Sequence, residues 1–131
     1  MNSAVAGLIA GIIGGIVAYI FVNIGGIIGV FPPSQVPAVT LATNHIILNT
    51  IWGIIFGVIY PKVYDVVPSK GISKGLIYGL VLFIITSFRT ATFYMPYASI
   101  DVYAATVSTW AFVGFFALTV YGIVLGALYK K

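Results

Sequence analysis

Four long apolar stretches, separated by proline-containing breaks, constrain this chain more than any other feature of its sequence. A helix needs about 20 mainly apolar residues to cross the hydrocarbon core of a bilayer. Four stretches reach that length, at residues 4–30, 39–60, 72–94 and 101–129. Proline cannot continue a helical hydrogen-bond ladder, and the breaks carry Pro32, Pro33, Pro37, Pro61, Pro68 and Pro96. The pattern predicts an all-α membrane protein in which residues 1–131 form a single domain of four transmembrane helices.

Charged residues are too scarce to cover a surface in water. Only 6% of the residues are charged and 61% are hydrophobic, whereas a soluble domain carries about 25% charged residues. The net charge of +4 comes from basic residues scattered along the chain. We therefore expect a lipid bilayer around the protein and no nucleic acid as a partner. Because the chain has no cysteine, disulfides and thiolate metal sites are excluded.

The basic residues predict the direction of the helices. With four spans, both termini and the second connection share one side, which carries Lys62, Lys70, Lys74, Lys130 and Lys131. The other side has Arg89 at most. Since cytoplasmic loops carry the excess of Lys and Arg, we expect both termini in the cytoplasm and a multi-pass protein of the cell membrane.

Two segments recur in the same order and predict a duplicated hairpin. Residues 7–11 (GLIAG) resemble residues 75–79 (GLIYG) at an offset of 68, and residues 53–60 (GIIFGVIY) resemble residues 122–129 (GIVLGALY) at an offset of 69. Residues 1–67 and 68–131 would then be parallel hairpin repeats, related by a pseudo-twofold axis along the membrane normal. The alternative is that glycine-spaced apolar helices resemble one another by chance.

Small residues at helical spacing predict where the helices touch. Lipid tails are as apolar as leucine, so helices associate in a membrane mainly through close backbone approach and dispersion. A glycine inside a helix costs about 1 kcal/mol relative to alanine, which indicates a packing role. The glycines concerned are Gly7, Gly11, Gly14, Gly15, Gly53, Gly57, Gly75, Gly79, Gly122 and Gly126. Their contacts would lie within the chain or with another protomer.

Polar side chains near the predicted outer surface are the candidates for a functional site. They are Asn23, Asn44, His45, Asn49, Arg89 and Asp101. An ionisable residue within a membrane span is expensive and is a functional candidate for that reason. His45 would either bond a neighbouring carbonyl or Asn23, or act in proton relay or ligand binding. We expect an ion pair between Arg89 and Asp101, the alternative being an anion or lipid-headgroup site at Arg89.

The sequence carries no motif that marks an enzyme. A phosphate loop, a nucleophile elbow, paired intramembrane carboxylates and a His pair are all missing. One His and one outer Asp are too few for a metal site unless another subunit shares it. We expect no catalytic residue, no metal and no cofactor.

The chain resembles small four-helix prokaryotic membrane proteins of unknown function, including the YagU-like group. The resemblance lies in residues 6–11 (AGLIAG), in the His45 segment leading into residues 53–60, and in residues 75–80 (GLIYGL). It implies the four-helix fold and no particular activity. The Ile-rich, cysteine-free composition is compatible with an archaeal or thermophilic source.

The chain has many glycines that predict helix packing and few side chains that could carry out catalysis. This combination predicts a non-catalytic subunit. It would pack through its Gly-rich helix faces into a larger membrane assembly, such as a respiratory or monooxygenase complex, or into a homo-oligomer. One alternative is a small carrier or channel with a polar outer vestibule. Another is a lipid-binding factor or an assembly or stress factor.

Overall fold

A computed structural model describes residues 1–95 and 99–131. Within these residues the chain forms four helices, α1 (Ser3–Ile27), α2 (Ala38–Val63), α3 (Gly71–Tyr94) and α4 (Ile100–Leu128). Each helix is long and apolar enough to cross a membrane. This agrees with the predicted all-helical, multi-pass membrane protein. The break expected at Pro96 lies outside the described residues.

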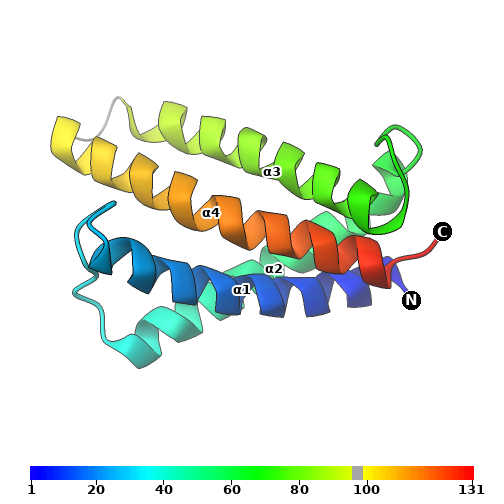
Figure 1. The fold of residues 1–131 in the computed structure, drawn as a ribbon, viewed down its shortest axis with the longest axis horizontal. Coiled ribbons are helices and arrows are strands. Elements are labelled where there is room, and N and C mark those ends of the chain that lie inside the picture. The colour runs from blue at the N-terminus through cyan, green and yellow to red at the C-terminus, as the bar shows by residue number, and fades with distance from the viewer. Residues whose placement is uncertain (96–98) are drawn as a thin grey trace.

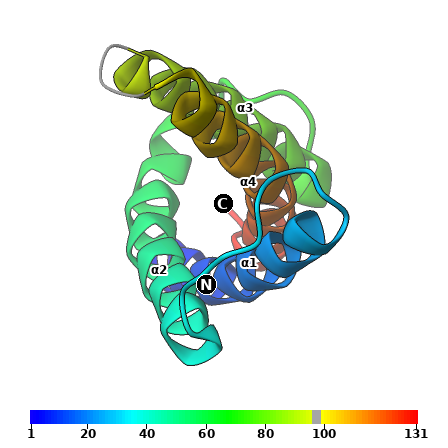
Figure 2. The ribbon, with the colours of Figure 1, turned by 90° about the vertical axis from the view of Figure 1, so that its left-hand side faces the viewer.

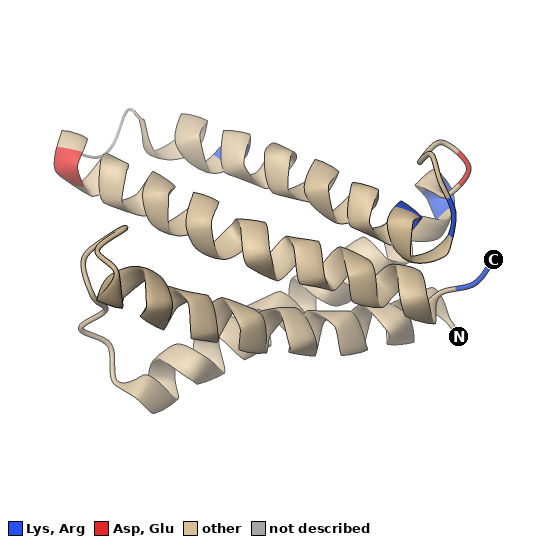
Figure 3. Ribbon diagram, in the orientation of Figure 1, with Lys and Arg blue, Asp and Glu red and all other residues tan. Residues whose placement is uncertain are grey.

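Both termini and the α2–α3 connection lie at the same end of the bundle (Figure 1). We call this the terminal end and the opposite end the distal end. Lysine residues gather at the terminal end, and the distal half carries few charged residues (Figure 3). The even number of helices places the termini together.

Helix α1 ends at Ile27, three residues before the predicted boundary. Gly29 adopts a positive φ of 80°, a conformation that glycine enters without a Cβ clash. The Val30 N–H then donates to the Gly25 carbonyl at 2.9 Å, which closes the helix with a glycine-based C-terminal cap. At the other end the Asn2 side chain accepts from the Ala4 N–H.

Helix α2 continues past Pro61, where the sequence predicts a break. Proline removes one N–H donor, but only a short stretch of helix remains before the end at Val63. Tyr60 and Tyr64 lie one turn apart and pack ring against ring across the proline, with centroids 5.4 Å apart. The proline therefore costs one hydrogen bond near a helix end and does not stop the helix.

The two central helices are α1 and α4. Helix α1 packs against both α2 and α4, and α3 packs against α4. Helices α2 and α3 flank this pair and share no comparable interface within the described residues. Figure 2 shows the consequence from the distal end, where α2 and α3 diverge.

Glycines bring α1 and α2 into backbone contact. A Cβ added to Gly11 would lie 2.6 Å from the Asn49 carbonyl oxygen, and one added to Gly57 would lie 2.6 Å from the Ser3 carbonyl oxygen. Gly7 and Gly53 have similarly little room. Since real Cβ atoms do not approach backbone this closely, only glycine allows this helix separation.

Helices α3 and α4 meet in the same way. A Cβ on Gly75 would lie 2.6 Å from the Gly126 Cα, and one on Gly126 would lie 2.7 Å from the Gly71 carbonyl oxygen. Gly79 and Gly122 also face each other across this interface.

A second ridge of small residues on α1 faces α4. Ala6, Ala10, Gly14 and Ala18 are all buried, and a Cβ on Gly14 would lie 3.6 Å from the Tyr121 Cβ. Helix α1 thus uses one small-residue face for α2 and a neighbouring one for α4. The predicted packing glycines contact helices of the same chain.

We predict that Gly122→Ala destabilises the protein and that Gly114→Ala does not. A Cβ on Gly122 would lie 2.9 Å from the Gly79 Cα, in rigid backbone, whereas one on Gly114 would meet the Trp110 ring at an ordinary 3.5 Å. Overpacking should cost about 1–3 kcal/mol, and alanine favours the helix by up to about 1 kcal/mol. Thermal unfolding in mild detergent measures both variants. Equal melting temperatures would contradict the close α3–α4 contact.

Candidate functional site

The predicted polar residues mostly bond within their own helices. The Asn23 amide donates to the Tyr19 carbonyl at 2.8 Å, and the Asn49 amide donates to the His45 carbonyl at 2.8 Å. Asn23 and Asn44 are exposed, and His45 is half-buried. No hydrogen bond joins Asn23, Asn44, His45 and Asn49 across helices in the described part of the chain. These four residues do not form a connected polar network.

His45 lies at the contact between α1 and α2. A Cβ on Gly15 would lie 2.9 Å from the His45 carbonyl oxygen, so the backbone of His45 is held against α1. The imidazole remains half-buried. The glycine contact therefore fixes the position of the His45 backbone on α2.

The expected ion pair between Arg89 and Asp101 is not formed. Among residues 1–95 and 99–131, the only ion pair joins Lys131 to Asp65. Asp101 lines a surface groove of about 510 Å³ together with Ser108 and the segment that follows α1, including Gly29 and Pro33. The start of α4 therefore faces the α1–α2 connection, and Arg89 is exposed on α3.

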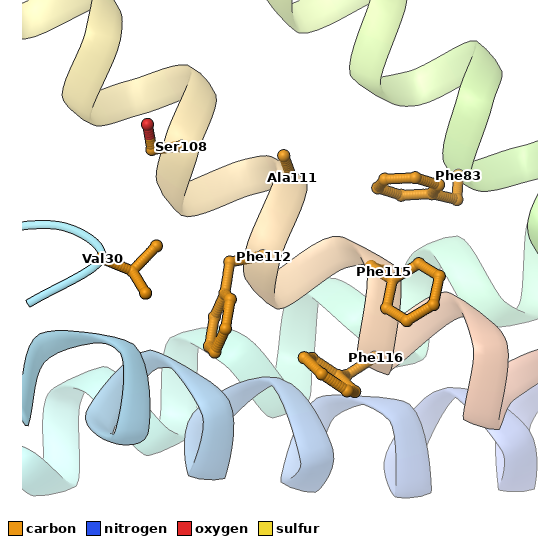
Figure 4. Close-up of a pocket in the computed structure, with 7 residues that line it drawn as sticks. All are labelled: Val30, Phe83, Ser108, Ala111, Phe112, Phe115 and Phe116. Carbon is orange, nitrogen blue, oxygen red and sulfur yellow. The ribbon is translucent and has the colours of Figure 1, made fainter. Parts of the chain in front are cut away.

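A second groove, of about 500 Å³, lies along α4 (Figure 4). Three α4 phenylalanines and Phe83 from α3 supply most of its surface, and Ser108 supplies a hydroxyl. Its full lining is Val30, Phe83, Ser108, Ala111, Phe112, Phe115 and Phe116. An open apolar groove of this kind suits hydrocarbon and offers no acid, base or metal ligand. Likewise, no three His, Asp or Glu side chains cluster anywhere in the described residues.

The most enclosed polar cluster lies at the terminal end, and the sequence did not predict it. It consists of Lys74 and four tyrosines, Tyr60, Tyr64, Tyr78 and Tyr129. The Lys74 side chain is 7% exposed; its ammonium donates to the Tyr64 carbonyl and lies 4.1 Å from the Tyr64 ring centroid. A cation over an aromatic face is stabilised by the ring quadrupole, so the Tyr64 ring offsets part of the cost of burying the lysine.

The sequence indicates only a role in membrane orientation for Lys74. One sequence feature singled out two of the tyrosines of this cluster: Tyr60 and Tyr129 occupy equivalent positions of the predicted repeat. In the structure their ring centroids are 5.6 Å apart. The pair therefore brings the terminal ends of α2 and α4 into contact.

Two tyrosine hydroxyls donate hydrogen bonds to main-chain carbonyls of α2, one from α4 and one from α3. The Tyr121 hydroxyl on α4 donates to the Gly53 carbonyl on α2 at 2.8 Å. The Tyr78 hydroxyl on α3 donates to the Phe56 carbonyl on α2 at 2.9 Å. By contrast, the buried Tyr60 hydroxyl has no hydrogen-bond partner within the described residues.

An exposed ion pair joins the C-terminus to the α2–α3 connection. The Lys131 ammonium donates to the Asp65 carboxylate, and this bond holds the pKa of that carboxyl below its ordinary value. The charge pair lies beside the tyrosine cluster, since Lys131 also lies 5.7 Å from the Tyr64 ring centroid.

The exposed face of α1 differs from those of α2 and α3 in its regular aliphatic stripe, beside which the exposed Asn23 lies near the distal end. Helix α1 presents a purely aliphatic stripe at four-residue spacing, made of Leu8, Ile12, Ile16, Ile20 and Ile24. The middle and distal parts of α2 and α3 also expose large apolar side chains, namely Ile47, Leu48, Ile51, Trp52, Ile84, Ile85 and Phe88. Among these lie the exposed polar residues Asn44 and Arg89. We call the exposed surface that these apolar residues form with Asn44 and Arg89 the unpaired faces of α2 and α3.

Comparison with known proteins identifies no relative. No family model matches the chain, and neither a curated protein nor a solved structure matches it significantly. The resemblance to YagU-like proteins therefore stays a prediction.

We predict that Tyr121→Phe destabilises the protein and that Tyr60→Phe leaves it unchanged or slightly more stable. Tyr121→Phe removes a buried interhelical hydrogen bond, which in a membrane protein contributes about 0.6 kcal/mol and up to about 1.7 kcal/mol. Tyr60→Phe removes a buried hydroxyl that lacks a partner in the described structure. Thermal unfolding of both variants in the same detergent provides the comparison. A larger loss for Tyr60→Phe would contradict this assignment of the hydroxyls.

Proposed function

We propose that the protein is a non-catalytic subunit of a larger membrane assembly and that its partner lies along the unpaired faces of α2 and α3. The observation that carries the proposal is the unequal packing of the four helices. Helices α1 and α4 are central, whereas α2 and α3 lack a comparable interface with each other in the described structure.

The glycine faces leave only certain surfaces for a partner. Gly7, Gly11 and Gly15 face α2, and Gly75 and Gly79 face α4, so these faces are already covered. The aliphatic stripe of α1 suits lipid. The unpaired faces mix large apolar groups with Asn44 and Arg89, and polar side chains facing hydrocarbon are expensive. This mixture favours a protein partner along α2 and α3.

The proposed topology places the terminal end in the cytoplasm. Lys62, Lys70, Lys130 and Lys131 are exposed near that end, and the positive-inside rule assigns such an end to the cytoplasm. The proposed location is the cell membrane.

The proposed fold is a duplicated hairpin, and equivalent contacts support it. Gly57 approaches the Ser3 carbonyl in the first hairpin, and Gly126 approaches the Gly71 carbonyl in the second. Ser3 and Gly71 are 68 positions apart, and Gly57 and Gly126 are 69 apart. Both offsets equal those of the recurring sequence segments.

We predict that gentle extraction and native mass spectrometry recover the protein with bound partner subunits or as an oligomer. Ile51→Trp, on α2, should weaken the affinity for the partner about tenfold, which corresponds to a loss of about 1.4 kcal/mol of binding free energy, and so lower the bound fraction. Ile16→Trp is the matched control, because Ile16 lies on the aliphatic stripe of α1 and is similarly exposed. Recovery of a monomer alone from every lipid-like detergent would refute the proposal.

A small carrier is the second candidate, and the difference between the two ends of the bundle favours it. Tyrosine rings from α2 and α4 pack together at the terminal end, whereas α2 and α3 diverge at the distal end (Figure 2). A carrier open toward one side of the membrane has such a shape.

If the protein is a carrier, liposomes containing it should take up a proton, an ion or a small solute faster than empty liposomes. His45→Ala should then slow uptake, since His45 lies on the diverging part of α2. Fluorescent flux assays with a panel of ions and solutes measure this, and Ile16→Ala, on the exposed aliphatic stripe of α1, is the control. Absence of flux for the wild-type protein would exclude this candidate.

A further inference from the structure

The hairpin relation sets an expectation for contacts between the hairpins. For each residue of α1 we define its mate as the α3 residue 68 positions later, and for each residue of α2 the α4 residue 69 positions later. A pseudo-twofold axis exchanges α1 with α3 and α2 with α4. If the axis held throughout, every contact between α1 and α4 would have an equivalent contact between α3 and α2.

The terminal end obeys this relation. Tyr60 and Tyr129 are mates of each other, and their rings are in contact. A residue can touch its own mate only near the axis that relates the two. The axis therefore passes between these two tyrosines.

The distal end departs from the relation. On one side, α1 and α4 are packed: Ala18 and Val22 lie in one buried cluster with Val113 and Ala117, and the Phe21 and Phe116 rings stack with centroids 3.9 Å apart. On the other side, the mates of this buried cluster are Thr86, Thr90, Asn44 and Leu48. Asn44 and Leu48 are exposed, and α2 and α3 diverge there (Figure 2).

The residues on the two sides explain why one interface is closed and the other open. The α1 ridge of Ala10, Gly14 and Ala18 is small, which allows close approach to α4. The mates of these three residues on α3 are Tyr78, Leu82 and Thr86, which are larger. The interface between α2 and α3 is therefore wider and more polar than the interface between α1 and α4, and its two helices separate more easily.

We propose that the distal halves of α2 and α3 close on each other in a second state, in the register of the α1–α4 interface. In that state Thr86 lies against Leu48 and Thr90 lies against Asn44. The closed state gives the Asn44 amide a partner, since Asn44 makes no hydrogen bond in the described part of this structure while the Thr90 hydroxyl donates to the Thr86 carbonyl and can still accept. The two hairpins then form a lateral gate that opens between α2 and α3. This inference concerns the chain alone and does not depend on the proposed partner.

Disulfide trapping in the cysteine-free chain tests the closure. The pair Leu48→Cys with Thr86→Cys reports the closed state. The reference pair is Ala18→Cys with Ala117→Cys, whose residues share one buried cluster. The control pair is Leu48→Cys with Ile84→Cys, because Ile84 is the mate of Ile16, which faces outward. All three are oxidised as purified chain in lipid nanodiscs, and intramolecular disulfides are identified by mass spectrometry.

Closure predicts rapid trapping of the reference pair and trapping of the Leu48–Thr86 pair about tenfold faster than the control pair, since cysteines more than about 7 Å apart between Cα atoms cannot be bridged without backbone movement. If the Leu48–Thr86 variant does not yield a folded monomer, the pair Asn44→Cys with Thr90→Cys is judged by the same criterion. Efficient trapping of the reference pair, with the reporting pair no faster than the control, would overturn the proposal. Because no partner is present, failure of the assembly proposal would not affect this result.

Discussion

Backbone-to-backbone contact at glycines is the interaction on which the rest of this structure depends. In a bilayer the apolar side chains gain little by leaving lipid for another helix, so association needs close approach and dispersion. Gly11 and Gly57 bring α1 and α2 into contact, and Gly75 and Gly126 do the same for α3 and α4. Each hairpin is thereby a unit whose helices touch through their main chains. The position of His45 and the course of α2 follow from these contacts.

The joining of the two hairpins relies on different chemistry. Small residues on α1 admit α4, and tyrosine hydroxyls donate to carbonyls of α2 from α3 and α4. Tyrosine suits this role because its ring packs among apolar groups while its hydroxyl reaches a main-chain oxygen. These bonds lie in the terminal half of the bundle. The terminal end is therefore closed by side chains that are both bulky and polar, with the buried Lys74 among them.

The asymmetry between the ends connects the packing with the proposed functions. Two hairpins with equivalent internal contacts would be expected to meet equally on both sides, yet α1 meets α4 closely while α2 and α3 remain apart at the distal end. The exposed mixture of apolar and polar residues on those two helices needs a cover other than hydrocarbon. A partner helix, a substrate, or closure of α2 on α3 would each supply it.

The sequence alone determined the helices and their number, because the length of each apolar stretch matches the thickness of a bilayer and proline interrupts the ladder between them. It also identified the small residues through which helices approach, since glycine at four-residue spacing has few other uses in a membrane span. It misplaced the end of α2 at Pro61, because a single missing N–H near a helix terminus is tolerated when the following turn packs. It also predicted an ion pair between Arg89 and Asp101 from their proximity in the chain.

The tertiary structure decided which glycine faces meet, that Asp101 faces the end of α1, and that Lys74 is buried among tyrosines. It also decided that α2 and α3 diverge at the distal end, although the Tyr78 hydroxyl joins them near the terminal end. These features depend on the angles at which helices cross, and crossing angles arise from the combined shapes of two surfaces. The residue pattern along one helix indicates that the helix has a packing face. Which helix packs against that face depends on the shapes of all four helices together.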